Sequence, residues 1–128
     1  NMPESFYKYN CNILEVVGEI EDVNDFIENK SCLFVPLFSG SGVRIKIIEA
    51  MSLGKIVIST SIGAEGISYQ DGKNILIADT AEVFADTMNE VSQQIDNYKH
   101  IGHEASKLIQ KEHSYINVIE RFHELAGI

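Results

Sequence analysis

The chain has 128 residues, 45% of them hydrophobic and 23% charged, which fits one globular domain with its own apolar core. Ten basic residues against 19 acidic ones give a net charge of −9. This balance does not predict the clustered cations by which proteins bind nucleic acid, so any phosphate must be held locally by backbone N–H groups and one or two cations. No apolar run approaches the roughly 20 residues that span a bilayer, and we expect no transmembrane segment.

The two cysteines, Cys11 and Cys32, lie in different predicted elements and match no metal-binding spacing. We interpret them as reduced thiols, which predicts a cytoplasmic protein. His100 and His103 have the spacing of one helix face, but two ligands are too few for a zinc site, and exposed polar positions are the better interpretation.

Short β-rich apolar runs alternate with helical patterns over the first eighty residues. Asp22, with Asp25 three residues later, resembles a capped helix start. Strands separated by helical crossovers predict a parallel α/β sheet with helices on both faces, and ligands bind such sheets beyond the carboxyl ends of the strands. The expected strands are 13–17, 32–36, 56–60 and 74–78, with helices over 22–27 and 43–53 and Gly54 ending the second.

Only helices are expected after residue 79. Asp79 with Glu82 resembles a capping box, and apolar residues repeat at helical spacing from Phe84 to Tyr98. A second helix is expected over 101–108, and a third is expected to start at Ser114.

The segment 36–42, P-L-F-S-G-S-G, joins a predicted strand to a predicted helix. Gly40 and Gly42 allow positive-φ turns and a close approach of a ligand to the backbone. The unpaired N–H groups and the dipole of the following helix would make an anion site without net basic charge. The loop matches neither common phosphate fingerprint, so an ordinary glycine-rich turn is the alternative.

Gly42, Lys46 and Glu49 have the spacing i, i+4 and i+7 of a single helix face. A ligand along this stripe would meet N–H groups and a cation with its phosphates, and a carboxylate with a vicinal diol. A nucleoside diphosphate has that layout. The alternative is a surface Lys–Glu pair, which contributes only about 0.2–0.5 kcal/mol.

The run 35–60, V-P-L-F-S-G-S-G-V-R-I-K-I-I-E-A-M-S-L-G-K-I-V-I-S-T, resembles the signature of glycosyltransferase family 4, the group 1 type, in the C-terminal domain of the GT-B fold. Further similarity lies in 17–22, V-G-E-I-E-D, in 63–67, G-A-E-G-I, in 71–77, D-G-K-N-I-L-I, and in 113–115, H-S-Y. The resemblance extends from about residue 13 to the end of the chain.

The resemblance implies that residues 1–128 are one nucleotide-sugar-binding C-terminal domain, with a Rossmann-like parallel sheet and flanking helices, as a partial GT-B domain. It implies the donor lobe of a retaining glycosyltransferase that needs no metal or other cofactor. The acceptor, such as a polysaccharide or a lipid-linked glycan of the cell envelope, would be bound by an N-terminal domain absent from this chain. The parent enzyme would be cytoplasmic, peripheral to the inner face of the membrane.

The family's E-x7-E motif implies that Glu49 binds the nucleotide ribose, with the backbone of Gly42 and Val43 near the diphosphate. The first glutamate of the motif is replaced by Ser41, which leaves recognition of the donor sugar open. The resemblance also offers Lys46 and Arg44 as phosphate partners, although Arg44 is off the stripe. The expected donor-binding residues are Gly40, Ser41, Gly42, Val43, Lys46 and Glu49, with Arg44 and Glu65 as secondary candidates.

The family's C-terminal domain begins with two further strands that carry a G-R…K-G pair, and the Arg and Lys of that pair neutralise the leaving diphosphate. This chain lacks both strands, so we expect it to be inactive alone, with an exposed sheet edge that repacks the first strand or pairs in a homodimer. Two alternatives are a non-transferring relative, such as a nucleotide-sugar epimerase, and a non-catalytic α/β nucleotide-binding module. A receiver-like module is disfavoured because the central strands end in Pro36 and Thr60 rather than in Asp.

Overall fold

The computed structural model describes residues 4–9, 11, 15, 17, 20–40 and 44–126, with residues 6, 7, 9, 23, 24, 44 and 113–126 described by their backbone alone. Most of the predicted strand over 13–17 lies outside the described residues, and the described Glu15 and Val17 are exposed and in no strand. The elements are the 3-10 helix η1 (Glu4–Tyr9), α1 (Val23–Glu28), β1 (Cys32–Val35), α2 (Arg44–Ser52), β2 (Ile56–Ser59), β3 (Leu76–Ile77), α3 (Ala81–Gln93) and α4 (Ile95–Ala126).

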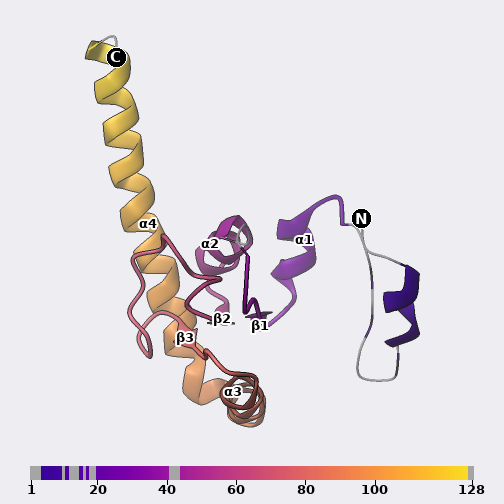
Figure 1. Ribbon diagram of the computed structural model, residues 1–128. Coiled ribbons are helices and arrows are strands. Elements are labelled where there is room, and N and C mark those ends of the chain that lie inside the picture. The colour runs from indigo at the N-terminus through magenta and orange to yellow at the C-terminus, as the bar shows by residue number, and fades with distance from the viewer. Residues whose placement is uncertain are drawn as a thin grey trace.

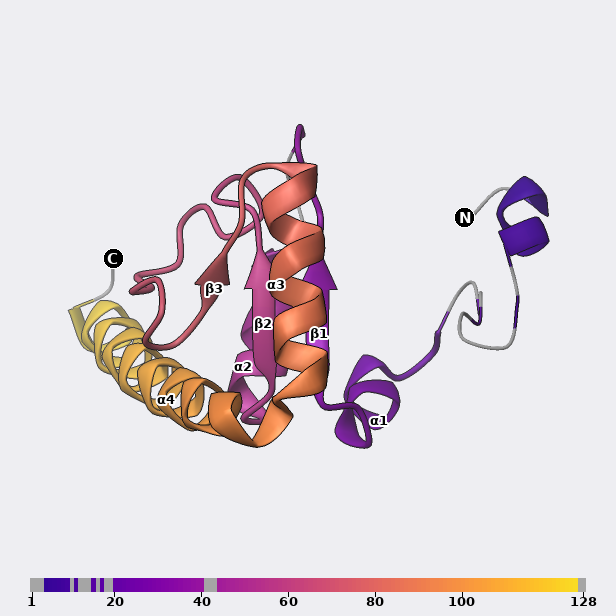
Figure 2. The same cartoon turned by 90° about the horizontal axis from the view of Figure 1, so that it is seen from below.

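The three described strands form one parallel sheet in the order β1-β2-β3. In its register, Leu33 lies opposite Val57, and Ile58 lies opposite Leu76. Figure 2 shows α3 over one face of this sheet, with α2 and α4 on the other. The α/β class predicted from the alternating pattern is therefore confirmed, because parallel strands require crossover helices that cover both faces.

The core has two parts because successive side chains of β2 point to opposite faces. Val57 packs in the cluster with Ile47 and Met51 of α2, and all three side chains are fully buried. Ile56 and Ile58 pack on the other face, in the cluster with Phe84 of α3. Burial of an aliphatic side chain of this size contributes about 1.5–3 kcal/mol, so β2 anchors both layers.

The edge strand β1 is less buried than its sequence predicts. All four residues of β2 are buried, whereas only Val35 is buried in β1. The expectation that 32–36 is covered on both faces is therefore wrong for most of the strand. The reason is its position, since among the described strands β1 pairs with β2 alone and lies at the edge of the sheet.

Two helix ends follow the sequence signals and one does not. Asp22 caps α1, and its carboxylate accepts a hydrogen bond from the Asp25 N–H at 3.2 Å. Gly54 ends α2 with a φ of +74°, a left-handed conformation that favours glycine. The capping box at Asp79 is wrong, because Thr80 has the extended backbone of a cap and accepts a hydrogen bond from the Val83 N–H at 3.2 Å.

The helices after residue 80 divide differently from the prediction. The apolar repeat of 84–98 spans a break, since α3 ends at Gln93 and Gln94 has a ψ of 44° that turns the chain into α4. No helix starts at Ser114, because α4 runs unbroken from residue 95 to 126. The stretch 103–126 contains no Gly or Pro to stop it. The C-terminal half of α4 projects beyond the sheet (Figure 1).

Candidate functional site

The carboxyl ends of the three strands meet at one edge of the sheet, where all three arrows end in Figure 2. We call this the carboxyl edge, and it comprises segment 36–40 after β1, segment 60–67 after β2 and segment 78–80 after β3. It is the position at which parallel α/β sheets bind ligands. The loops at this edge are tied to one another by side chains.

Thr60 connects the first two of these segments. Its hydroxyl donates a hydrogen bond to the carbonyl of Leu37 and accepts one from the Gly63 N–H at 3.1 Å. Its side chain lies in the core, with the residue only 1% exposed. Gly63 is equally constrained, because a Cβ there would lie 2.6 Å from the Ser59 hydroxyl and 3.2 Å from a methyl group of Val35.

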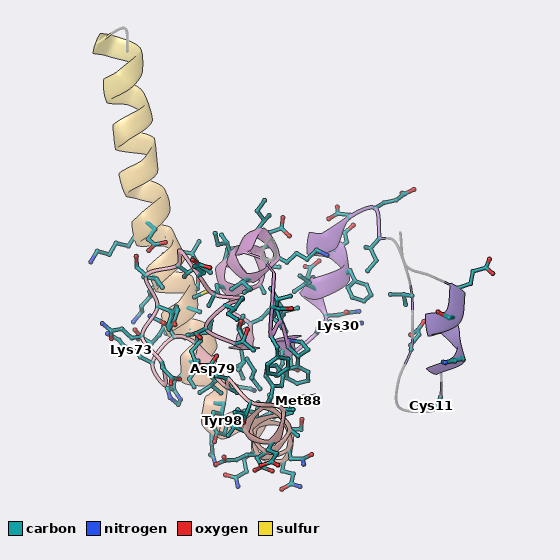
Figure 3. The ribbon with its side chains drawn as sticks, in the orientation of Figure 1. Cys11, Lys30, Lys73, Asp79, Met88 and Tyr98 are labelled. Carbon is teal, nitrogen blue, oxygen red and sulfur yellow. The ribbon has the colours of Figure 1, made fainter. Side chains whose placement is uncertain are left out.

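Asp79, which Figure 3 labels, connects the segments after β2 and β3 through Ser61. One carboxylate oxygen accepts hydrogen bonds from the backbone N–H and the hydroxyl of Ser61, each at 2.8 Å. These two bonds, the backbone one first, lower the pKa of Asp79 because they stabilise its ionised form. The pair was not predicted from the sequence, although Ser61 and Asp79 follow two predicted strands and parallel strands end at one edge.

The glycine loop is described only in part. Gly40 has a φ of +93°, which confirms that the loop needs glycine at this position. Ser41, Gly42 and Val43 lie outside the described residues, and Arg44 opens α2 with only its backbone described. The anion site at the start of α2 therefore stays a prediction.

Lys46 and Glu49 lie on α2, at the two other positions of the predicted stripe. The Lys46 side chain is exposed and borders an apolar cavity of about 250 Å³ beside β1, lined by Leu33 and Pro36 among others. Lys46 and Glu49 form no ion pair within 4.0 Å, so the simple surface-pair interpretation of their spacing does not hold.

Glu49 is half-buried, and its Oε2 atom has no solvent exposure and no hydrogen-bond partner among the described groups. A buried polar atom without a partner costs about 1–3 kcal/mol, so it calls for an explanation, such as an ordered water or a bound ligand. This unpartnered carboxylate oxygen is the feature of α2 that points most directly to a ligand with hydroxyl groups.

The other sequence candidates contribute less to the site. Glu65 is exposed in the turn after β2, and His100 and His103 are exposed on α4 as expected. Both cysteines are unpaired, and burial raises the pKa of the Cys32 thiol. Among the described residues, no group of three or more His, Cys, Asp or Glu side chains could hold a metal ion.

The carboxyl edge also exposes large apolar side chains. Phe38 after β1 is 45% exposed and contacts Phe84 of α3 edge to face, with ring centroids 6.5 Å apart. Ile62 of the segment after β2 is exposed as well, as are Ile45 in the first turn of α2 and Val83 in the first turn of α3. We call these four exposed residues the apolar rim.

Two comparisons with known proteins found a match. The family model described as "Glycosyl transferases group 1" matches residues 4–94. A protein of Klebsiella pneumoniae, described as an "uncharacterized 44.6 kDa protein in cps region", is 31% identical over 107 residues. That alignment covers 82% of this chain and 28% of the relative, so the chain spans less than a third of the relative's length. No solved structure matches. None of the described helices is long and apolar enough to cross a membrane.

Proposed function

Because the chain belongs to the group 1 glycosyltransferases, we propose that residues 1–128 form the donor-binding domain of a retaining enzyme of the GT-B fold. The donor would be a nucleotide-activated sugar, bound at the carboxyl edge of the sheet. The buried, unpartnered Oε2 atom of Glu49 carries this proposal, since it lies on α2 inside the matched region.

In this proposal Glu49 binds the ribose. A carboxylate accepts hydrogen bonds from two neighbouring hydroxyls, and a vicinal diol offers them at the right spacing. Glu49 is only half-buried, and a rotation of its side chain toward the ligand would let a ribose diol give the Oε2 atom the partner that it lacks within the described chain. The penalty of the unpartnered oxygen would then be relieved only when the nucleotide is bound, which favours the complex.

The diphosphate would lie toward the start of α2. There the free N–H groups and the helix dipole favour negative charge, and the Lys46 ammonium would add a cation one turn further on. These groups would stabilise the departing nucleoside diphosphate while the acceptor attacks the anomeric carbon. We propose no metal at the site. Ser41 stands where the family has the first motif glutamate, so the group that would contact the donor sugar stays open.

The apolar rim of Phe38, Ile45, Ile62 and Val83 supports a two-domain enzyme. Exposed apolar residues gathered at one edge favour a covering partner. We assign this role to an acceptor-binding domain in the longer parent protein. The cps-region relative supports an acceptor in polysaccharide biosynthesis, such as a growing polysaccharide or a lipid-linked glycan at the cytoplasmic face of the membrane. This chain alone would bind the donor without transferring it.

Calorimetric titration of UDP, GDP and ADP into the chain tests the proposal. We expect at least one nucleotide to bind, and we expect Glu49→Gln to weaken its binding about tenfold, or about 1.4 kcal/mol. The matched control is Glu82→Gln, which makes the same charge change at an exposed position of α3 and should leave affinity unchanged. Binding of none of the three nucleotides would refute the donor-binding function.

A deoxynucleotide sharpens the assignment of Glu49. If its carboxylate contacts the ribose diol, the 2′-deoxy form of the best nucleotide loses affinity for the native chain but little further for Glu49→Gln. Additive losses would place the carboxylate elsewhere in the site.

A further inference from the structure

A second cavity lies at the opposite edge of the sheet, which we call the amino edge because the strands begin there. Its volume is about 440 Å³. Three segments far apart in the sequence meet around it, as the lower side of Figure 2 shows for the starts of β1, β2 and α4. They are Lys30–Ser31 before β1, the turn 52–56 between α2 and β2, and one face of α4 with Lys99, His103 and Ser106.

The charge of this cavity is opposite to that of the chain. Lys30, Lys55 and Lys99 line it and no Asp or Glu does, although the chain carries a net charge of −9. Concentrated charge of one sign in a concave, protein-walled site attracts counter-ions from solution. The hydroxyls of Ser31 and Ser106 add neutral donors to the same walls.

The three lysines keep donors free for a ligand. The Lys55 ammonium donates to the Glu28 carbonyl at 2.7 Å, which leaves two of its three N–H groups. Lys30 lies 4.9 Å from the centre of the Phe26 ring (Figure 3 labels Lys30), and that contact uses no carboxylate. Lys99 pairs with Asp96 at 2.9 Å, but both side chains are more than 70% exposed, so the pair is weak and open to competition.

The backbone holds these groups in fixed positions. Ile95, Lys99 and His103 follow one another at intervals of four residues, so they share a face of α4 that starts at the positive end of its dipole. Gly102 presses this helix against the turn before β2, since a Cβ there would lie 2.1 Å from the Gly54 carbonyl oxygen. Lys99 and Lys55 are therefore brought to one cavity by backbone packing rather than by flexible loops.

We propose that the amino-edge cavity binds a compact phosphate-bearing anion, such as a diphosphate or a sugar phosphate, at a site separate from the donor site. Its volume falls within the range of about 300–1,000 Å³ that is common for small-molecule sites. Phosphate oxygens accept from ammonium and hydroxyl donors of the kind found here, and their charge strengthens each bond. A nucleic-acid backbone is disfavoured as the ligand, because the acidic remainder of the chain would repel it.

Amide-resolved NMR titration of the chain with inorganic pyrophosphate tests the site. We expect saturable shifts at Ser31, Gly54, Lys55 and Lys99, and we expect them to weaken as sodium chloride rises from 50 to 300 mM, because salt screens the attraction. Glucose 1-phosphate in a second titration decides whether a sugar phosphate enters as well. Chemical-shift changes confined to the carboxyl edge would overturn the proposal. Equal changes with sulfate would overturn it too, because they would show an adventitious ion only.

Two double lysine variants with the same change in net charge separate binding at the cavity from attraction by the overall charge of the chain. Lys30→Gln with Lys99→Gln should weaken pyrophosphate binding about tenfold or more, since two of the three cations are lost. The matched control is Lys73→Gln with Lys107→Gln, at a different cavity of about 220 Å³ whose lining includes the Glu104 carboxylate. This control makes the same change in net charge and should alter affinity less than twofold.

Equal weakening in both pairs would contradict a specific site. All four lysines are exposed, so folding of the variants is checked by circular dichroism, and the shift map of the native chain stands independently of them. Glu49→Gln should leave pyrophosphate binding at the amino edge unchanged, which separates this site from the donor site.

Discussion

The two edges of the sheet differ in how they are built and in what they can bind. The carboxyl edge is held by side-chain hydrogen bonds, from Thr60 to Leu37 and from Ser61 to Asp79, and it carries a buried carboxylate oxygen on Glu49 nearby. The amino edge is held by a close approach of backbones at Gly54 and Gly102, and it carries three lysines. The net charge of −9 reveals neither the Glu49 carboxylate nor the three lysines, because it sums groups that the fold places at different ends of the sheet.

The largest effect is expected at the amino edge, from Gly102→Ala. The new methyl group would meet the Gly54 carbonyl oxygen at 2.1 Å, and that atom belongs to the backbone, so α4 must move away from the turn. We expect a loss of about 3 kcal/mol in the free energy of unfolding, at the upper end for overpacking. Urea denaturation measures it.

Lys111→Ala, at an exposed position of the same helix, is the control and should change stability by less than about 0.5 kcal/mol. If Gly102→Ala were as mild as this control, the close approach at the amino edge would be wrong. Weakened pyrophosphate binding in a folded Gly102→Ala protein would sharpen the comparison, since the amino-edge cavity depends on this contact.

An intermediate effect is expected at the carboxyl edge, from Thr60→Val. Valine keeps the shape of threonine but removes the hydroxyl that donates to the Leu37 carbonyl and accepts from the Gly63 N–H. Leaving such buried groups unsatisfied should cost about 2 kcal/mol in urea denaturation. Nucleotide binding should suffer in this variant while pyrophosphate binding at the amino edge should not. An equal loss at both edges would show that they are not built independently.

The smallest effect is a pH dependence from Asp79. Its pKa is lowered in the folded chain, so its bonds to Ser61 stabilise the fold fully above the ordinary value of 3.8, and this contribution is lost as the pH falls through the lowered value. Asp79→Asn should therefore be less stable than the native chain at pH 6, with the difference shrinking toward pH 3. A difference that stays constant over this range would mean that the carboxylate charge plays no part.

Much of the fold could be predicted from local patterns. Apolar runs placed β1 and β2 correctly, and the caps at Asp22 and Gly54 were read correctly because they depend on neighbouring residues alone. The predicted helix boundaries were wrong where two sequence signals competed. Asp79 and Thr80 are both good capping residues, and only the backbone conformation shows that Thr80 is the cap. Ser114 resembled a cap, but nothing before it stops α4.

Only the site features that depend on residues close together in the sequence could be predicted. The positive φ of Gly40 and the position of Glu49 on α2 follow from one loop and one helix, whereas Ser41, Gly42 and Val43 lie outside the described residues and stay predictions. Sequence separation hides the remaining features. Ser61 meets Asp79 because the sheet aligns the ends of β2 and β3. Lys30 and Lys99 line one cavity because α4 packs against the turn before β2.

The length of α4 makes the position of its last residue sensitive to the packing of its first half. At about 1.5 Å per residue, the helix extends about 36 Å from Gly102 to its last residue. A rotation of about 5° at Gly102 would therefore displace that end by about 3 Å, roughly the length of a hydrogen bond. The packing of α4 from Gly102 to Ile109, beside the lysines, therefore also sets where the end of α4 lies in space.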